Sequence, residues 1–578
     1  MSKSILALAK LTRFKTPSQS ILLSKRRSAG SKKKTYVICT GILTGMSLCS
    51  IASFTPVLSE AEQEMPVATG SIMDKVISSL ADPNNRIALR DKPTTSLILS
   101  LLVYKACSMK WLIDSAPSIF SYASYTHLTK PINFIIRHTV FNQFVGGESS
   151  QDCQKTMSKL KDQGIGVILA LSVEMDVGDV KETNASHQSI HMNQQADFFM
   201  DATKQCILSA GTQPGNFIAL KISALTSPHL LQKVTGVLSK LYESFGQHTS
   251  VSSHTLSQNQ VCHVVAQHRG LVNVEENVPE IIHNSNEIDI VDFKQMMLLH
   301  RPAVMSLLSN VLTEQDQEDW LRMLHRVDEI CSLAKSCGVK VLIDAEQTYL
   351  QLAIDQAASV MEQKHNQLGS RPTVFNTYQM YTKTALPKLK LDLVTAERYK
   401  YGLGVKLVRG AYMVQERARA AELGYSDPIQ NTINDTHESY HSAILLLLKA
   451  LEVTQQRTGI PVTEETSPLS FVIASHNHES VMYACNELQH HHISLDSGVV
   501  SFGQLYGMAD KISYTLSQFG LPVYKYLPYG EVKQVIPYLI RRGQENAAMI
   551  ERTQLECELI FDELKYRFQQ NNTRQMKE

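Results

Sequence analysis

Residues 523–546 read VYKYLPYGEVKQVIPYLIRRGQEN, and the organisation of the chain can be worked out from this stretch. Its first residues, rich in valine and tyrosine, favour a β-strand, which Pro528 and Gly530 then end. From Val532 onward the apolar residues recur at intervals of three and four, which is the spacing of one face of a helix. This apolar face consists of Val532, Val535, Ile536, Leu539 and Ile540.

The opposite face of this predicted helix is polar. The side chains that point away from the apolar face are Tyr538, Arg541, Arg542 and Glu545. Two adjacent guanidinium groups beside a tyrosine and a carboxylate suit a bound carboxylate anion, because arginine is a planar, two-pronged donor. The alternative is an ordinary solvated helix face, which is what spacing alone favours.

Seven further strand-like runs precede this stretch, and most are nearly continuous in apolar residues, as expected of strands buried on both faces. The eight runs are residues 166–172, 217–223, 340–346, 373–380, 404–412, 470–477, 499–505 and 523–530. Helical stretches separate them. Strand then helix, eight times, predicts an α/β fold: a distorted (β/α)8 TIM-like barrel. A doubly wound open sheet would alternate in the same way, but the count of eight favours the barrel.

The interval between the second and third runs, residues 224–339, is too long for one helix and predicts an insertion. Residues 247–287 are polar and rich in His, Asn and Ser, which indicates a surface excursion. Near its end we expect a helix capped by Thr313. Its buried side would carry Trp320, Met323, Leu324, Val327 and Ile330.

Charge is unevenly distributed along the chain, although the net charge is only +1. Residues 1–59 contain ten Lys and Arg and no Asp or Glu, while the remainder has a net charge of −9. A basic, acid-free start resembles a mitochondrial targeting segment; a basic arm that binds nucleic acid or lipid is the alternative. The acidic remainder argues against nucleic acid as the main ligand.

Residues 36–54 are uncharged and could just span a bilayer. We favour the interpretation that this run is part of the targeting segment, and an anchor in the inner membrane is the alternative.

The ten cysteines are scattered, without a CxxC pair, which fits free thiols in a reducing compartment. His490, His491 and His492 form a tract without further ligands nearby, so we expect a surface helix end and no metal site.

We expect a helical N-terminal region over residues 60–140, a barrel over 141–555 and a charged tail over 556–578.

Polar side chains follow most of the predicted strands. They are Lys221, Asp344, Asn376, Lys406, Arg409, His476, Asn477 and Tyr526. Chemistry in a barrel lies at the carboxyl ends of the strands, so these residues predict a rim that holds a large polar ligand. The chain has no phosphate loop, dinucleotide fingerprint, GxSxG or HExxH motif. A nucleotide cofactor would therefore have to bind on the rim.

Four motifs in order carry a specific resemblance. They are LVRGAYM at 407–413, ASHN at 474–477, FGQLYGMAD at 502–510, and YLPYG with YLIRRGQEN within 526–546. From about residue 141 to about residue 550 the chain is similar to the flavin-dependent proline dehydrogenase family. The resemblance implies a distorted barrel carrying FAD, oxidation of L-proline to Δ1-pyrroline-5-carboxylate, and transfer of electrons to quinone. It also implies a place on the matrix side of the mitochondrial inner membrane.

The resemblance assigns roles to residues. Arg541 and Arg542 would hold the carboxylate of proline, with Glu545 bracing them. Lys221 would add positive charge, and Asp344 would orient the site near the amine. The residues that would wall the ring are Tyr412, Leu505, Tyr526 and Tyr538. The residues that would line FAD are Lys406, Val408, Gly410, Asn376, Ser475, His476 and Asn477.

The chain departs from the family pattern in places. Lys406 stands where bacterial members have Arg, and Asn376 stands where Gln is known. A carboxylate after the first strand closes the site in bacterial members; here Glu174, Asp176 and Asp179 all qualify. The hydroxyproline-oxidising branch tends to have Ser at the position of Tyr526, so we expect a preference for proline.

Three alternatives stay open from the sequence. One is hydroxyproline oxidation on the same fold. Another is a barrel lyase that uses Lys221 as a Schiff-base amine. The third is a binding protein that senses an amino acid without catalysis.

Overall fold

The computed structural model describes residues 70–109, 111–116, 118, 129–172, 185–248, 255–257, 260–261, 264, 287–299, 304, 311–548 and 550–575. The predictions for residues 1–59, including the run 36–54, lie outside this part of the chain. So do those for Glu174, Asp176 and Asp179, and the side chain of Glu545 is likewise not described.

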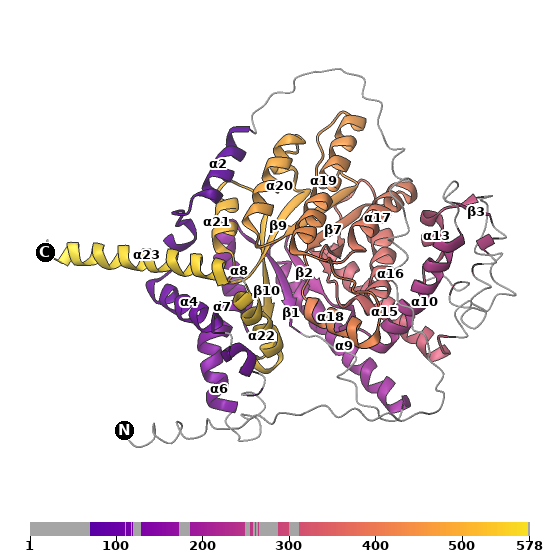
Figure 1. Ribbon diagram of the computed structural model, residues 1–578, viewed down its shortest axis with the longest axis horizontal. Helices are drawn as coiled ribbons and strands as arrows, with labels where there is room; N and C mark the ends of the chain where they lie inside the picture. Colours follow the sequence, from indigo (N-terminus) through magenta and orange to yellow (C-terminus); the bar gives the residue numbers. More distant parts are fainter. Residues whose placement is uncertain are drawn as a thin grey trace, which may run out of the picture. The chain divides into compact units, whose positions relative to one another are not determined.

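Eight parallel strands close into a barrel (Figure 1). They are β1 Gly166–Leu171, β2 Phe217–Leu220, β5 Lys340–Ile343, β6 Val374–Gln379, β7 Leu403–Val408, β8 Leu469–Ala474, β9 Val500–Leu505 and β10 Val523–Tyr529. Their order around the barrel is β1-β10-β9-β8-β7-β6-β5-β2. The first and last strands pair from Gly166 with Tyr524 to Leu171 with Tyr529, which closes the sheet. The predicted barrel is therefore confirmed, and the open sheet is wrong.

Helices that precede or separate the strands cover the barrel. They are α8 Cys153–Asp162, α9 Ala185–Ala210, α10 Pro228–His248, α15 Glu314–Ser336, α16 Thr348–His365, α17 Ala385–Tyr399, α18 Met413–Leu423, α19 Ile433–Thr458, α20 His478–His490 and α21 Asp510–Gln518, with short 3₁₀ turns Ile222–Ala224 and Leu495–Ser497. Their apolar sides and the outward side chains of the strands form one continuous core.

The insertion contributes a two-stranded sheet of β3 Leu256–Ser257 and β4 Glu287–Ile288, and the helix α13 Ile290–Met296. The predicted helix over its end is α15. Thr313 caps it in a capping box with Asp316, as expected. The five predicted core residues of α15 are all buried, and the indole of Trp320 donates to the carbonyl of Leu299 at 2.9 Å.

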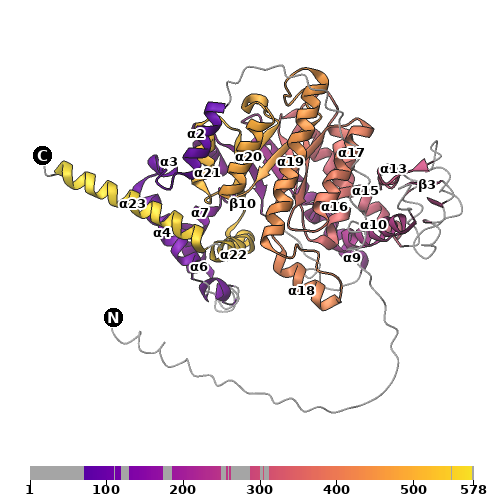
Figure 2. The same cartoon turned by 45° about the horizontal axis from the view of Figure 1, so that its top comes forward.

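A second, smaller core joins the two ends of the described chain. It takes side chains from α3 Ile87–Arg90, α4 Thr94–Cys107, α6 Thr129–Ile136, a π-helical turn Arg137–Phe141, α7 Asn142–Phe144, α22 Val532–Ala548 and α23 Ile550–Gln575. Helix α2 Gly70–Ala81 belongs to the main core, through Met73, Val76 and Leu80. Residues from α4, α7, α22 and α23 share one apolar cluster. Figure 2 shows α22 and α23 beside α4 and α6, beyond the end of β10. Most of the expected charged tail is thus helix α23.

Within the described residues no helix is long and apolar enough to cross a membrane, and no group of three or more His, Cys, Asp or Glu could hold a metal. Seven cysteines in this part of the chain are free thiols. His491 differs from the expected surface residue: it is buried, with Nδ1 at 2.7 Å from a carboxylate oxygen of Glu452.

Candidate active site

Side chains alternate between the two faces of each strand, and this decides which rim residues face the barrel interior. The interior cluster contains Ile168, Phe217, Leu342, Phe375 and Val472. Counting in steps of two from these residues and along the strand pairing, the inward positions at the carboxyl ends are Lys221, Asp344, Lys406, Val408, His476, Leu505 and Tyr526. The register therefore brings seven of the predicted site residues to one rim.

The centre of this rim is a carboxylate shared by two side chains. Lys406 forms an ion pair with Oδ1 of Asp344, and the hydroxyl of Tyr526 donates to Oδ2 of the same carboxylate at 2.9 Å. The Lys406 ammonium also lies 5.8 Å from the centre of the Tyr526 ring. Asp344 and Lys406 are both buried. A charge pair in such a place holds its geometry tightly, because each group would be costly to bury alone.

Asn376, which the resemblance assigned to the cofactor, does not lie among the inward positions of this rim. It lies within β6 on the outward register, and its amide nitrogen donates to Asp355 of α16 at 3.1 Å. Gln379 lies on the inward register at the end of the same strand, opposite Val408. Its amide donates to the carbonyl of Glu346 at 2.7 Å. Sequence reasoning missed Gln379, although the alternation along residues 374–379 could have identified it.

The ends of β7 and β8 are joined by Arg409, a residue that the sequence placed on the rim without a role. Its guanidinium donates to the hydroxyls of Ser475 and Ser480, each at 2.8 Å, and lies 4.5 Å from the centre of the Tyr440 ring. Asn477 caps α20 by accepting from the amide of Ser480 at 3.1 Å. Cationic and N–H donors thus gather at the N-terminal end of a helix, where anionic groups are favoured.

Gly410 follows β7 with φ of 145°, in a region that residues with a side chain rarely adopt. A Cβ there would lie 2.3 Å from the ring of Tyr381, so glycine lets the backbone pass close to this ring. Two residues later the amide of Tyr412 donates to the Tyr381 hydroxyl at 3.3 Å. The turn after β7 is therefore held against a buried tyrosine.

The polar face of α22 is buried at two of its positions. Arg542 is 5% exposed and Tyr538 8%, and the guanidinium of Arg542 lies 4.8 Å from the centre of the Tyr538 ring. Such stacking is a favourable cation–π arrangement. Arg541 is half-buried. The alternative of a solvated polar face is therefore wrong for Tyr538 and Arg542.

Leu505 connects α22 to the barrel rim. Its backbone amide donates to Nε2 of His476 at 2.9 Å, and its side chain packs against the apolar cluster that contains Tyr538. Lys221 is half-buried directly after β2. The arrangement combines a partly buried cationic helix face, a buried carboxylate and a donor-rich rim, which suits polar ligands that carry negative charge.

Fold and rim define a (β/α)8-barrel enzyme, and comparison with known proteins gives its family. Residues 153–554 match the family model described as proline dehydrogenase. The chain belongs to the proline dehydrogenase family, and it is therefore an oxidoreductase.

Several relatives are similar over most of their length. A protein from Homo sapiens named proline dehydrogenase 1, mitochondrial, is 30% identical over 85% of this chain and 90% of its own. A hydroxyproline dehydrogenase from Xenopus laevis is 31% identical over 82% of this chain and 88% of its own. A solved structure of proline utilization A from Bdellovibrio bacteriovorus, inactivated by N-propargylglycine, matches with a TM-score of 0.50 at 13% identity. It covers 82% of this chain and 41% of that one, and supports the fold alone.

Proposed function

We propose that this protein oxidises L-proline to Δ1-pyrroline-5-carboxylate with FAD as its cofactor. The observation that carries the proposal is the pairing of a buried cationic helix face, Arg542 stacked on Tyr538, with the Lys406–Asp344–Tyr526 centre on a barrel rim. Family membership supports the same reaction.

The substrate would be held at its carboxylate. Arg541 and Arg542 offer planar paired donors, and Lys221 adds positive charge at the end of β2. The ring would lie among Tyr412, Leu505, Tyr526 and Tyr538. Fixing the acid group at one end orients the carbon next to the amine, so binding energy is converted into orientation.

The residues present fit FAD. Lys406 would place a cation beside the flavin ring, and Val408, Gly410 and Gln379 would line it. Ser475, His476 and Asn477 would contact its polar parts, with Arg409 holding Ser475 in place. When bound, FAD would accept the hydride from the substrate carbon. The protein's own task is to place and orient the substrate beside the cofactor and to enclose both.

The amine must be neutral before the adjacent carbon can lose hydride. Burial and aromatic walls disfavour a charged ammonium and would help its deprotonation. Asp344 cannot readily take over as a free base, because it is already shared by Lys406 and Tyr526. We infer that Asp344 orients these two side chains and the amine.

We propose mitochondrial residence on the matrix side of the inner membrane, with quinone as electron acceptor. The relatives named mitochondrial and the basic, acid-free residues 1–59 support this place. Fractionation of mitochondria, with and without alkaline salt extraction, would test both the residence and the strength of attachment.

Anaerobic titration of the purified protein with L-proline tests the reaction. Bleaching of a visible flavin spectrum by proline is expected. A colourless protein that borohydride traps on a carbonyl substrate would support the lyase instead, and proline binding without bleaching would support a sensor.

Arg541→Met and Arg542→Met separate a substrate role from a structural one. Each should raise the apparent KM for proline by roughly 10²-fold, the effect of losing a charged hydrogen bond of about 3 kcal/mol, while flavin content stays near that of the wild type. Equal loss of flavin and of activity would assign these arginines a folding role.

A further inference from the structure

The turn after β9 is held from outside the barrel by the N-terminal helices. The Tyr104 hydroxyl of α4 donates to the carbonyl of Gly507 at 2.7 Å, and the Gln143 amide of α7 donates to the same oxygen at 3.0 Å. Ser100 donates to Oε1 of Gln143 at 2.8 Å, which fixes the orientation of this amide. All three side chains are buried.

Gly507 also allows the backbone of the turn to approach the backbone of α7 closely. Its φ is +73°, and a Cβ at this position would lie 1.9 Å from the backbone carbonyl oxygen of Gln143. Only glycine lets the turn approach α7 so closely. The turn therefore has little freedom to shift while Gln143 stays in place.

The inner side of the same turn is held by a buried lysine. Lys525 of β10 donates to the carbonyl of Met508 at 2.6 Å and pairs with Asp510 at 2.7 Å. Burial opposes the charge on Asp510, but Lys525 and Lys92 outweigh it and hold the pKa of this carboxyl below its ordinary value. The turn is thus fixed on both sides by groups that would be costly to leave unpaired.

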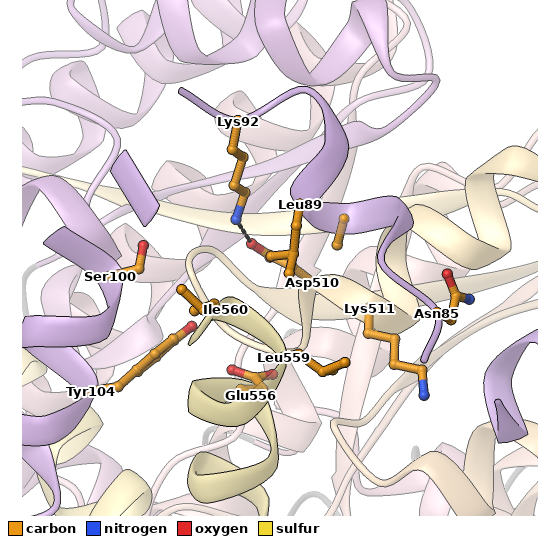
Figure 3. A pocket seen from close by; sticks show the side chains of 11 residues that line it. Asn85, Leu89, Lys92, Ser100, Tyr104, Asp510, Lys511, Glu556, Leu559 and Ile560 are labelled. Carbon is orange, nitrogen blue, oxygen red and sulfur yellow. Dashed lines mark hydrogen bonds and ion pairs between the residues drawn. The ribbon is translucent and has the colours of Figure 1, made fainter. Parts of the chain in front are cut away.

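Figure 3 shows the surroundings of Ser100 and Tyr104. Ser100 and Tyr104 lie on the wall of a pocket that Lys92, Asp510 and Glu556 also line, with the Lys92–Asp510 contact at 2.5 Å drawn as a dashed line. Glu556 comes from α23, so both ends of the described chain meet around this turn. Burial, followed by the nearby Asp510, raises the pKa of Glu556 above its usual range.

What the turn carries is part of the substrate site of the proposed function. Leu505 begins the turn, since the amide of Met508 donates to its carbonyl at 3.2 Å. The Leu505 side chain reaches the cluster that contains Val535 and Tyr538 of α22. A shift of this turn would therefore move Leu505 relative to the apolar cluster to which α22 contributes.

We propose that Tyr104 and Gln143 are positioning residues for the substrate site. Acting through Gly507, they hold Leu505 against the ring of the bound amino acid and keep α22 in register with the rim. The N-terminal helices thereby take part in substrate recognition. This inference rests on the proposed function, because the ligand that Leu505 would touch is the substrate of that reaction.

Tyr104→Phe and Gln143→Met test the inference, with Tyr378→Phe as the matched control. Tyr378 is also buried and loses one hydroxyl contact, to Asp392 at 2.6 Å, but on the outer face of β6. We expect the KM for L-proline to rise roughly tenfold in each test variant, with kcat and flavin content changed far less, because small displacements of a substrate wall are felt strongly in binding. Tyr378→Phe should lose stability without a change in KM.

A double variant adds a readout that a purely structural role would not move. Tyr104 and Gln143 donate to one oxygen, so the combined effect on KM should be clearly smaller than the product of the two single effects. If either variant fails to fold, Ser100→Ala, which only releases the Gln143 amide, should raise KM in the same direction by a smaller factor.

The outcomes distinguish this inference from the proposed function. A wild-type protein that proline does not bleach would overturn both. If proline bleaches the wild type but Tyr104→Phe and Gln143→Met have the same KM for proline as the wild type, only the positioning role is overturned. An equal rise of KM in Tyr378→Phe would overturn it as well, because the effect would then follow general destabilisation.

Discussion

At the scale of single residues, the rim depends on Asp344. One carboxylate serves a lysine from β7 and a tyrosine from β10, so three strands share one charge. Lys406 stands where bacterial relatives were expected to have arginine. A point charge with three donors can pair with Asp344 and still face a cofactor, but it cannot form a two-pronged contact.

Lys406→Met should destabilise the fold by about 3 kcal/mol or more, because it leaves Asp344 buried without its cation. Urea unfolding would measure this loss. Lys340→Met is the matched control, since Lys340 is also buried and pairs with Glu464 at the opposite end of the barrel. Both variants should lose stability, but only Lys406→Met should lose flavin. Loss of flavin in both would remove the cofactor role of Lys406.

Tyr526 is the residue at which substrate preference is expected to be set. Tyr526→Ser should open space for a 4-hydroxyl group and increase kcat/KM for 4-hydroxyproline relative to proline by roughly tenfold, the usual scale for a small change in pocket size. Tyr526→Phe keeps the ring and removes the hydroxyl that donates to Asp344. Its preference for proline should persist. Comparable turnover of both substrates by the wild type would contradict the prediction.

At the scale of elements, helix α22 shows how burial changes the meaning of an amphipathic pattern. Its apolar face packs as expected, with Val532 and Val535 in the second core. Its polar face is also covered, at Tyr538 and Arg542. The charges of a helix buried on both sides must pair with a ligand or with other protein groups, and this supports the substrate-binding role proposed for α22.

The capping box at the start of helix α15 offers a simpler test, because its contribution to stability is local. Thr313→Ala removes the side-chain acceptor for the amide of Asp316 and breaks the capping box. The expected cost is about 1 kcal/mol of unfolding free energy, seen as a lower urea midpoint with an unchanged slope. Activity per folded molecule should not change, because α15 covers the outside of the barrel. A raised KM or a reduced kcat would connect this helix to the site.

At the scale of the whole molecule, the two ends of the described chain close on one another. Arg567 of α23 donates to the carbonyls of Lys92 at 2.7 Å and Leu89 at 2.8 Å. The ion pairs of Asp510 with Lys92 and Lys525 lie beneath this contact. Helix α22, which is proposed to bind the substrate, therefore packs in a core that both ends of the described chain help to build.

This arrangement predicts how stability changes in acid. The pKa of Asp510 is lowered below its ordinary value of 3.8, so its contribution is present above that pH and is lost as the pH falls through the folded-state pKa. Asp510→Asn should be less stable than the wild type at neutral pH by about 3 kcal/mol, because two lysines lose their counter-ion. The difference between the two unfolding free energies should shrink as the pH falls below 3.8, and it should disappear only below the folded-state pKa of Asp510. A constant difference across this range would contradict the lowered pKa.

The sequence by itself determined the eight strands, their parallel order in a closed barrel, the capped helix at Thr313 and most of the rim residues. These follow from local causes: buried strands are continuous apolar runs, and barrel chemistry lies where strands end. Motif resemblance then added the family.

Only the tertiary structure decided which side chains face the site. Neighbouring side chains on a strand point to opposite faces of the sheet. The sequence therefore identified β6 as part of the rim but assigned the role to Asn376, which points outward, and not to Gln379, which points inward. Burial of Arg542 and the support of Gly507 by Gln143, 364 residues away, depend on contacts between distant segments. Local periodicity carries no information about such contacts, because it describes a segment and not the surface that the segment meets.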